Sequence, residues 1–167
     1  SNAATLTVNA LPAISSSPLS QTICAGSNVS FSTAATGTGI TYQWQVNTGT
    51  GFVNVTNAGA YNGANTATLN ITGATVAFNG YQYQCVVSGT CAPAPTSAAA
   101  TLTVHAPVVV TGSPANAEVC AGTNATFSVS GTSVPAINYQ WQVSTDGGTS
   151  WTNLAGSTSS TYTTTST

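Results

Sequence analysis

Apolar and polar residues alternate along short stretches of this chain. Residues 42–46 and 139–143 both read YQWQV, with an aromatic or aliphatic side chain at every second position and Gln between them. A period of two is typical of a β-strand that has one buried and one exposed face. The pattern therefore predicts a strand at both places, with Trp44 and Trp141 pointing inward. Because the two stretches match, it also predicts an internal repeat.

Other matching segments give the length of the repeat. Residues 4–8 and 100–104 both read ATLTV, 96 positions apart. The sequence CAG at residues 24–26 occurs again at 120–122, at the same offset. One repeat is therefore close to a hundred residues long, and the chain is long enough for one complete copy and part of a second.

The repeat divides the chain into four parts. We interpret residues 1–3 as the remnant of an affinity tag and residues 4–9 as the last strand of a preceding repeat. Residues 10–105 then form one complete domain, and residues 106–167 form a second domain that lacks its last strands. Such a domain would have an open core and free strand edges. We expect residues 4–8, or the edge of another molecule, to cover it, which predicts strand exchange or an oligomer.

Turn residues separate seven stretches of alternation in the first repeat, which predict strands at residues 20–23, 28–35, 40–46, 52–55, 66–72, 81–88 and 98–104. Short strands at this spacing, without any helical pattern, favour an antiparallel β-sandwich. Inward positions such as Trp44, Tyr83 and Cys85 should meet in one core. The predicted fold class is all-β, with two sandwiches in tandem and the second incomplete.

The chain carries almost no charge, since it has no Lys or Arg and only two acidic residues. Proteins that bind nucleic acid or anionic membranes need basic side chains to neutralise phosphates. Composition therefore excludes both classes of partner. No apolar run approaches the roughly 20 residues of a membrane-spanning helix, so membrane insertion is not expected either.

The four cysteines are Cys24, Cys85, Cys91 and Cys120, and the single histidine is His105, in the boundary between the two copies. No C-x-x-C spacing is present, so neither a metal site nor a cofactor is expected. Cys85 reads as a small buried hydrophobe. Cys24 and Cys91 could link successive repeats through a disulfide. The alternatives are a Cys85–Cys91 bond, a distorted pairing of Cys24 within the domain, or free thiols.

Residues 144–151 (STDGGTSW) match a pattern known from hairpin turns of β-proteins. Asp146 can accept hydrogen bonds from backbone amides of the turn, and Trp151 can fold back on the hairpin. A glycosidase would need a second carboxylate beside Asp146, and Glu118 is a poor candidate. One histidine at a domain boundary cannot complete a catalytic triad. We therefore expect no catalytic residues and no enzymatic activity.

Four glutamines form a candidate binding face. Gln43 and Gln45 on one predicted strand and Gln82 and Gln84 on another alternate with inward residues, so they should project from the outer face of one sheet. Such a face could bind sugars through its amides, or it could simply be solvated.

Several motifs resemble one family of domains. They are CAG at 24–26, VSFS at 29–32, YQWQ at 42–45, TLNI at 68–71, YQCVVS at 83–88 and AATLTV at 99–104. In these motifs the chain resembles the immunoglobulin-like repeats of large secreted and cell-surface adhesins of bacteria, many of which use type IX secretion. The resemblance implies an immunoglobulin-like sandwich. Thr33 stands where antibody domains carry the strand B cysteine, so their inter-sheet disulfide is not expected.

The resemblance and the composition together imply a non-catalytic structural or adhesive module of a large bacterial surface protein, located outside the cell. Its expected partners are neighbouring repeats of the same protein, with surface glycans and other proteins as further candidates. The alternative is a carbohydrate-binding module of a secreted enzyme. That alternative predicts an exposed aromatic strip, for which Trp151 is a candidate.

Overall fold

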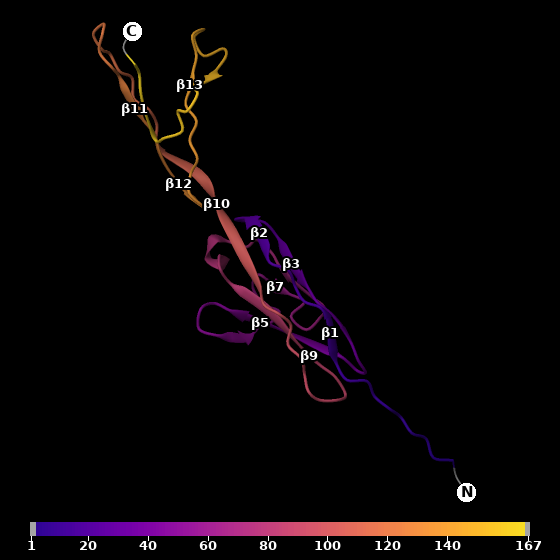
Figure 1. The fold of residues 1–167 in the computed structure, drawn as a ribbon. Coiled ribbons are helices and arrows are strands. Elements are labelled where there is room, and N and C mark those ends of the chain that lie inside the picture. Colours follow the sequence, from indigo (N-terminus) through magenta and orange to yellow (C-terminus); the bar gives the residue numbers. More distant parts are fainter. Residues whose placement is uncertain (1–2, 166–167) are drawn as a thin grey trace. The chain divides into compact units, whose positions relative to one another are not determined.

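A computed structural model describes residues 3–165 of the chain, which divide into two compact units (Figure 1). Unit 1 extends to His105 and unit 2 begins at Ala106. Residues 1 and 2 of the expected tag remnant, and residues 166 and 167 of the expected second domain, lie outside the described residues.

The larger sheet of unit 1 is built around β5 (Thr41–Asn47), whose alternating sequence buries one face. β5 pairs antiparallel with β9 (Gln82–Ser88) on one side and with β6 (Phe52–Asn54) on the other. β9 also pairs antiparallel with the first residues of β10 (Ala100–Gly112). β2 (Gln21–Cys24) joins the free edge of β10 in parallel, with Leu102 opposite Gln21 and His105 opposite Cys24.

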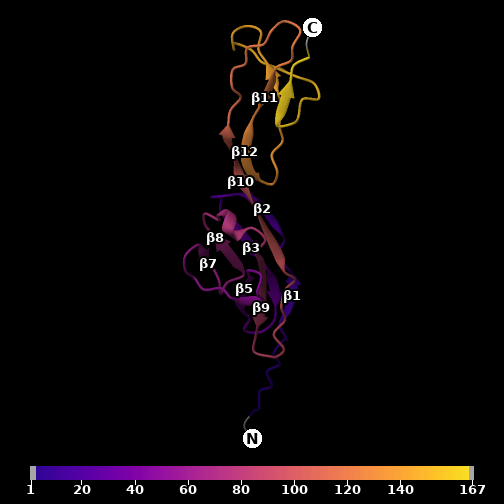
Figure 2. The same cartoon turned by 90° about the vertical axis from the view of Figure 1, so that its left-hand side faces the viewer.

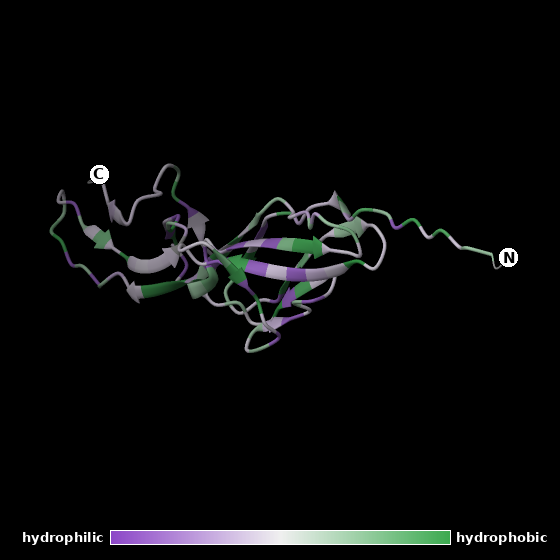
Figure 3. Cartoon of the chain, turned by 90° about the horizontal axis from the view of Figure 1, so that it is seen from below, coloured by the Kyte–Doolittle hydropathy of each residue, from purple (hydrophilic) through white to green (hydrophobic). Residues whose placement is uncertain are grey.

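The second sheet of unit 1 has three antiparallel strands in the order β3 (Val29–Ser32), β8 (Thr68–Ile71) and β7 (Tyr61–Asn62). A single turn of 3-10 helix, η1 (Val76–Phe78), lies between β8 and β9 along the chain. The two sheets bury their inner faces in one core. Figure 3 shows hydrophobic and hydrophilic residues following each other along the strands, as a half-buried sheet requires.

The predicted strand at residues 28–35 is interrupted at Thr33. After β3, the chain continues as β4 (Ala34–Thr36), which pairs with the additional strand β1 (Ala13–Ser16). The Thr33 hydroxyl donates a hydrogen bond to the carbonyl oxygen of Ser16 (2.7 Å), so this buried side chain ties the break to β1. Antibody domains carry a disulfide-bonded cysteine at this position, and here the Thr33 hydroxyl makes a hydrogen bond instead.

The core of unit 1 contains residues of both sheets. Phe31 and Tyr83 stack with their ring centroids 4.8 Å apart, and the Trp44 side chain is fully buried. Burying each large apolar side chain contributes about 1.5–3 kcal/mol before ordering entropy is counted. The largest fully buried side chains are Trp44, Tyr83, Phe31, Leu69, Ile71, Leu102, Val87, Val104 and Cys85.

Unit 2 repeats part of this plan with shorter strands. β11 (Thr126–Ser128) pairs with β15 (Thr161–Thr163), which matches the pairing of β3 with β8 (Figure 2). β13 (Gln142–Val143) and β14 (Thr152–Asn153) form a hairpin that matches β5 and β6. The later residues of β10 pair with β12 (Ser130–Val134).

Besides the break at Thr33, further strands differ from the sequence-based expectation. The last predicted strand, 98–104, continues as β10 to Gly112, so His105 is a half-buried strand residue rather than part of an exposed linker. β1 and β7 were not predicted. The all-β prediction itself is confirmed, since no α-helix occurs within residues 3–165.

Candidate functional site

The glutamine face lies on β5 and β9 of unit 1. In the antiparallel register Gln45 is opposite Gln84, and Asn47 is opposite Gln82. Their neighbours Trp44 and Cys85 point into the core, where both are fully buried. The glutamine side chains are themselves half-buried rather than fully exposed.

The amides of this face bond to each other. Gln84 Nε2 donates to Gln45 Oε1 (2.8 Å), and Gln45 Nε2 donates to Asn54 Oδ1 (2.9 Å). We call these three residues, which lie on β9, β5 and β6, the amide row. Beside it, Asn47 Nδ2 donates to Gln82 Oε1 (3.3 Å). A sugar would have to replace these hydrogen bonds with its own, which leaves little net gain. The geometry therefore favours a structural role for this face.

Gln43 has a different task, which sequence reasoning missed. Its Nε2 donates to the carbonyl oxygens of Trp44 (2.8 Å) and Val55 (2.9 Å), and its Oε1 accepts from Asn65 Nδ2 (2.9 Å). The side chain thus holds the strand end beyond β6 against β5. The repeated Gln of the YQWQV motif could have signalled this, because its role recurs in unit 2.

In unit 2, Gln140 Nε2 donates to the carbonyl oxygens of Trp141 and Leu154, both at 2.9 Å. Gln142 Nε2 donates to Asn153 Oδ1 (2.9 Å), as Gln45 does to Asn54 in unit 1. Both glutamines of the motif are therefore clamps for the β-hairpin that follows them.

Trp44 and Trp141 make the same polar contact but differ in burial. Trp44 Nε1 donates to the Thr66 carbonyl oxygen and Trp141 Nε1 donates to the Ser159 carbonyl oxygen, each at 2.9 Å. Trp44 has no exposed surface, whereas Trp141 is only half-buried. Trp141 is thus held like Trp44 but is covered less completely. The strand that pairs with β5 over Trp44 has no counterpart in the described part of unit 2.

An apolar groove of about 440 Å³ is open in unit 2 beside Trp141. We call it the open groove. Tyr162 stands at one wall, with its ring centroid 5.9 Å from that of Trp141. Trp151 stands at the rim and is 60% exposed. The open groove is also lined by Pro114, Phe127, Gln142, Val143, Ser144, Leu154 and Thr164.

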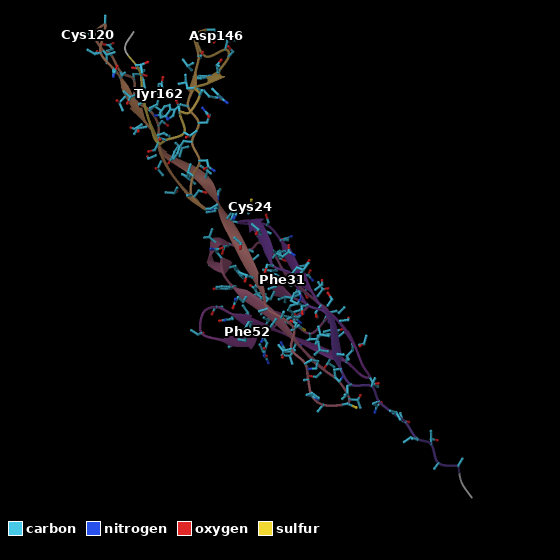
Figure 4. All side chains as sticks on the ribbon, in the orientation of Figure 1. Cys24, Phe31, Phe52, Cys120, Asp146 and Tyr162 are labelled. Carbon is cyan, nitrogen blue, oxygen red and sulfur yellow. The ribbon has the colours of Figure 1, made fainter. Side chains whose placement is uncertain are left out.

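Asp146 organises the turn between β13 and β14 (Figure 4). Its Oδ1 accepts hydrogen bonds from the amides of Thr149 (3.0 Å) and Ser150 (2.9 Å) and from the Ser144 hydroxyl (2.8 Å). The Ser150 hydroxyl donates to Oδ2. The hydrogen bonds from Ser150, and then from Ser144, lower the pKa of Asp146 well below its usual range. All these contacts serve the turn.

The ring of Trp151 lies close to the Asp146 turn. The Trp151 ring passes near Gly148, where an added Cβ would lie 3.9 Å from it, so the ring does fold over the hairpin. In residues 3–165, no group of three or more His, Cys, Asp or Glu side chains could hold a metal ion.

All four cysteines are free thiols. Cys85 is buried in the core, which raises the pKa of its thiol to about 11. Cys91 lies on the β9–β10 loop with its Sγ 3.7 Å from the Asn9 carbonyl oxygen. Cys24 and Cys120 are exposed (Figure 4). The alternative Cys85–Cys91 bond is therefore not formed, because one thiol faces the core and the other faces the chain ahead of β1.

The positions of Cys24 and Cys91 bear on the expected link between repeats. Cys91 touches Asn9, and Cys24 lies opposite His105 in the β2–β10 register. Asn9 and His105 are equivalent positions of successive repeats, 96 residues apart. A disulfide between these two kinds of cysteine across a repeat boundary stays a prediction.

The chain shows similarity to other proteins at two levels. Residues 110–167 match the model of a domain of unknown function, DUF8696. This is less than half of the chain. The search of curated proteins found no match to this chain. Among the described residues, no helix has the length and hydrophobicity that a membrane crossing requires.

Solved structures with a similar fold consist of immunoglobulin domains in tandem. The four N-terminal immunoglobulin domains of Dscam1 isoform 6.9 align with a TM-score of 0.62 at 18% identity, over 97% of this chain and 40% of that one. The I-band fragment I67-I69 from titin gives 0.59 at 19% identity, over 82% and 47% of the two chains. Immunoglobulin domains 1-5 of Sidekick-1 give 0.60 at 20% identity, over 81% and 28%. The chain thus spans less than half the length of each. It has the fold of tandem immunoglobulin-like β-sandwiches.

Proposed function

We propose that this chain is a non-catalytic structural module of a large extracellular bacterial protein, in which its repeats act as load-bearing spacers between adhesive parts. The observation that carries the proposal is the parallel pairing of β2, early in the sequence of unit 1, with β10, its last strand. The extracellular and bacterial parts of the proposal are supported by the motif resemblance and by the charge-poor composition.

The chain enters and leaves unit 1 at opposite ends. Ala10 is held at one end, where it exchanges hydrogen bonds with Thr38, and Thr38 in turn accepts one from the Thr90 amide. His105 lies at the other end, where its carbonyl oxygen accepts from the Ala25 amide (2.8 Å). β9 runs between these two ends, and its seven residues have a length of about 23 Å.

This arrangement decides how tension acts on unit 1. A pull on the two ends draws β2 backward and β10 forward, parallel to their shared edge. The hydrogen bonds between them are then loaded in shear and must break together rather than one after another. A parallel pair between a strand near the start of unit 1 and its last strand therefore suits a domain that has to carry force along its chain.

Thr103 offers a direct test. The amides of Leu102 and Val104 donate to Tyr81 and Asn79, so the Thr103 amide between them faces β2. Thr103→Pro removes this donor. We expect single-molecule stretching of the chain to show a clearly lower unfolding force for unit 1 in this variant than in the native chain.

A control separates mechanical from thermodynamic effects. Leu69→Ala removes core volume from β8 and should lower the free energy of unfolding by about 2–5 kcal/mol, while the β2–β10 edge stays intact. We expect it to reduce the unfolding force less than Thr103→Pro does. If the two variants and the native chain all unfold at the same force, the spacer proposal is wrong.

Carbohydrate binding is the competing function, and the exposure of Trp151 at the open groove is the observation that favours it. Aromatic rings at a groove are a common platform for sugars. Titration with soluble polysaccharides while tryptophan fluorescence is recorded distinguishes the two functions. Quenching that disappears in Trp151→Ala would support a sugar site, whereas a spacer predicts unchanged fluorescence.

A further inference from the structure

Residues 4–8 have the sequence of a core strand but are fully open to solvent. Leu6 and Val8 are 87% and 83% exposed, and the segment belongs to no strand. The identical sequence ATLTV at residues 100–104 forms the start of β10. There, the equivalent residues Leu102 and Val104 have no exposed surface. The same five-residue sequence is thus paired and packed into a core at residues 100–104, but it is unpaired and exposed at residues 4–8.

The described residues of unit 2 include no strand that corresponds to residues 100–104 of β10 in unit 1. In unit 1, β10 pairs in parallel with β2, and its Leu102 and Val104 belong to the core. Residues 117–120 are the counterpart of β2, 96 positions later, and they are exposed and in no strand. Val119, the counterpart of Ile23, is 53% exposed, and the open groove lies in the same unit.

We propose that residues 4–8 of one molecule bind as a strand to unit 2 of a second copy of this chain. The β2–β10 register carries over by repeat equivalence, so that Leu6 lies opposite Ala117, Thr7 opposite Glu118, and Val8 opposite Val119. The strands run in parallel. Leu6 and Val8 then point into the unit that holds the open groove, as Leu102 and Val104 point into unit 1.

We assign the donor strand to another molecule. Ala10 is fixed to Thr38 at one end of unit 1, whereas the chain passes into unit 2 beyond His105, at the opposite end. Five residues in extended conformation span only about 17 Å, which is less than the length of β9. Residues 4–8 and unit 2 are different surfaces of the chain, so the association is head to tail and builds open-ended chains.

Sedimentation velocity over a range of concentrations tests the association. We expect the native chain to form a ladder of species that grows with concentration. Leu6→Ser combined with Val8→Ser should raise the dissociation constant at least about tenfold, because two buried apolar side chains are lost. The matched control, Thr5→Ser with Thr7→Ser, changes the outward positions of the same strand and should associate like the native chain.

The result that overturns the proposal is equally clear. A native chain that stays monomeric up to its solubility limit has no such association. Association that Leu6→Ser with Val8→Ser leaves unchanged must use another surface, and this too overturns the proposal. Both variants change only exposed residues ahead of β1, so unit 1 remains folded in all samples.

A disulfide cross-link tests the register. Cys24, Cys91 and Cys120 are first replaced by Ser, and two variants then carry Thr7→Cys or Glu118→Cys. Oxidised glutathione is added to their mixture, where it takes up the two electrons and two protons of the thiols and leaves as two molecules of glutathione. We expect a linked heterodimer between the two variants.

Thr145→Cys, on the exposed β13–β14 turn, replaces Glu118→Cys in the control mixture. This mixture should give at least about tenfold less of the linked species if pairing is specific for the proposed register. Equal yields in both mixtures would mean random collision, and the absence of any Thr7–Glu118 link would likewise contradict the parallel register.

Discussion

Two ionisable side chains lie in the apolar core of unit 1, where they are most strongly affected by their surroundings. Cys85 and Tyr83 have no exposed surface. Burial raises the pKa of the Cys85 thiol to about 11. Burial also raises the pKa of the Tyr83 phenol far above its ordinary value, and the hydrogen bond with the Tyr61 hydroxyl (3.2 Å) adds to the effect. Both groups are therefore neutral at neutral pH in folded unit 1.

The first prediction concerns thiol reactivity. The thiolate is the reactive form, so Cys85 should resist a thiol reagent at pH 8 both because it is buried and because its pKa is near 11. Cys24 and Cys120 are exposed and should be labelled rapidly. Mass spectrometry after timed labelling checks this. Addition of denaturant should make Cys85 react as fast as the other two, and rapid labelling of Cys85 in the native chain would contradict its placement in the core.

The second prediction concerns alkaline stability. The folded-state pKa of Tyr83, and that of Tyr61, lies above the unfolded value of about 10. Their contribution to stability is therefore fully present below pH 10 and is lost as the pH rises above it, because the unfolded chain releases these protons more readily. Urea midpoints of unit 1 should fall with pH in this range. Tyr83→Phe should fall less steeply, and equal slopes for both proteins would refute this explanation.

At the scale of single elements, the turn between β7 and β8 depends on one glycine. Gly63 has a φ of 82°, and a Cβ there would overlap the Thr68 carbonyl oxygen. The next residue, Ala64, is buried and its carbonyl oxygen accepts the Trp44 amide (2.9 Å). The turn thus brings its backbone against both β8 and β5, and it can do so only without a side chain at Gly63.

The third prediction follows from this turn. Gly63→Ala should lower the free energy of unfolding of unit 1 by about 2 kcal/mol or more, since the strained φ and the steric overlap add up. Gly59→Ala is the matched control. Gly59 also has a positive φ, 60°, but a Cβ there meets nothing within 4 Å, so it should cost only about 1 kcal/mol. Urea denaturation followed by Trp44 fluorescence, with Trp141→Phe and Trp151→Phe in both proteins, measures both losses, and equal losses would rule out the overlap.

The elements that the sequence predicts well are those with a strong local signal. β5 and β9 have seven residues each and strict alternation, and both were expected within one residue of their observed bounds. β7 has two residues, which is too short for alternation to be recognised, and β1 has four and pairs with β4, which lies beyond β2 and β3 along the chain. No local pattern marks such pairings.

The candidate site was predictable only in part, for the same reason. Alternation indicates that Gln43, Gln45, Gln82 and Gln84 share a face of β5 and β9. Their mutual hydrogen bonds depend on the register between strands and on side-chain rotamers, which alternation does not contain. The open groove exists because β9 and the first part of β10 in unit 1 have no counterpart among residues 113–165. The position of Trp151 at its rim depends on how the Asp146 turn folds.

At the scale of the whole molecule, the two units differ in the completeness of their cores. The core of unit 1 unites residues of both sheets, whereas Ala125 is the only buried hydrophobic residue among the described side chains of unit 2. Burial of apolar surface is the main favourable term in folding. Unit 2 should therefore be the less stable of the two.

The fourth prediction is that the intact chain unfolds in two steps. With Trp141→Phe and Trp151→Phe, the remaining Trp44 reports on unit 1; with Trp44→Phe, fluorescence reports on unit 2. We expect the urea midpoint of unit 2 to be the lower one. We also expect it to rise with protein concentration, because a bound second copy stabilises the state it binds. Coincident midpoints at all concentrations would contradict both expectations.

The amide row has a consequence for how this sequence can evolve. Gln45 donates to Asn54 and accepts from Gln84, so each member depends on the polarity of its neighbour. A carboxylate at position 45 would still accept the hydrogen bond from Gln84. It would have no donor for Asn54 Oδ1, so two oxygen atoms that repel each other would face each other there. The effects of substitutions at these positions are therefore coupled. During evolution we expect the three residues to be substituted in compensating pairs, while the surrounding Thr and Ser residues are substituted independently.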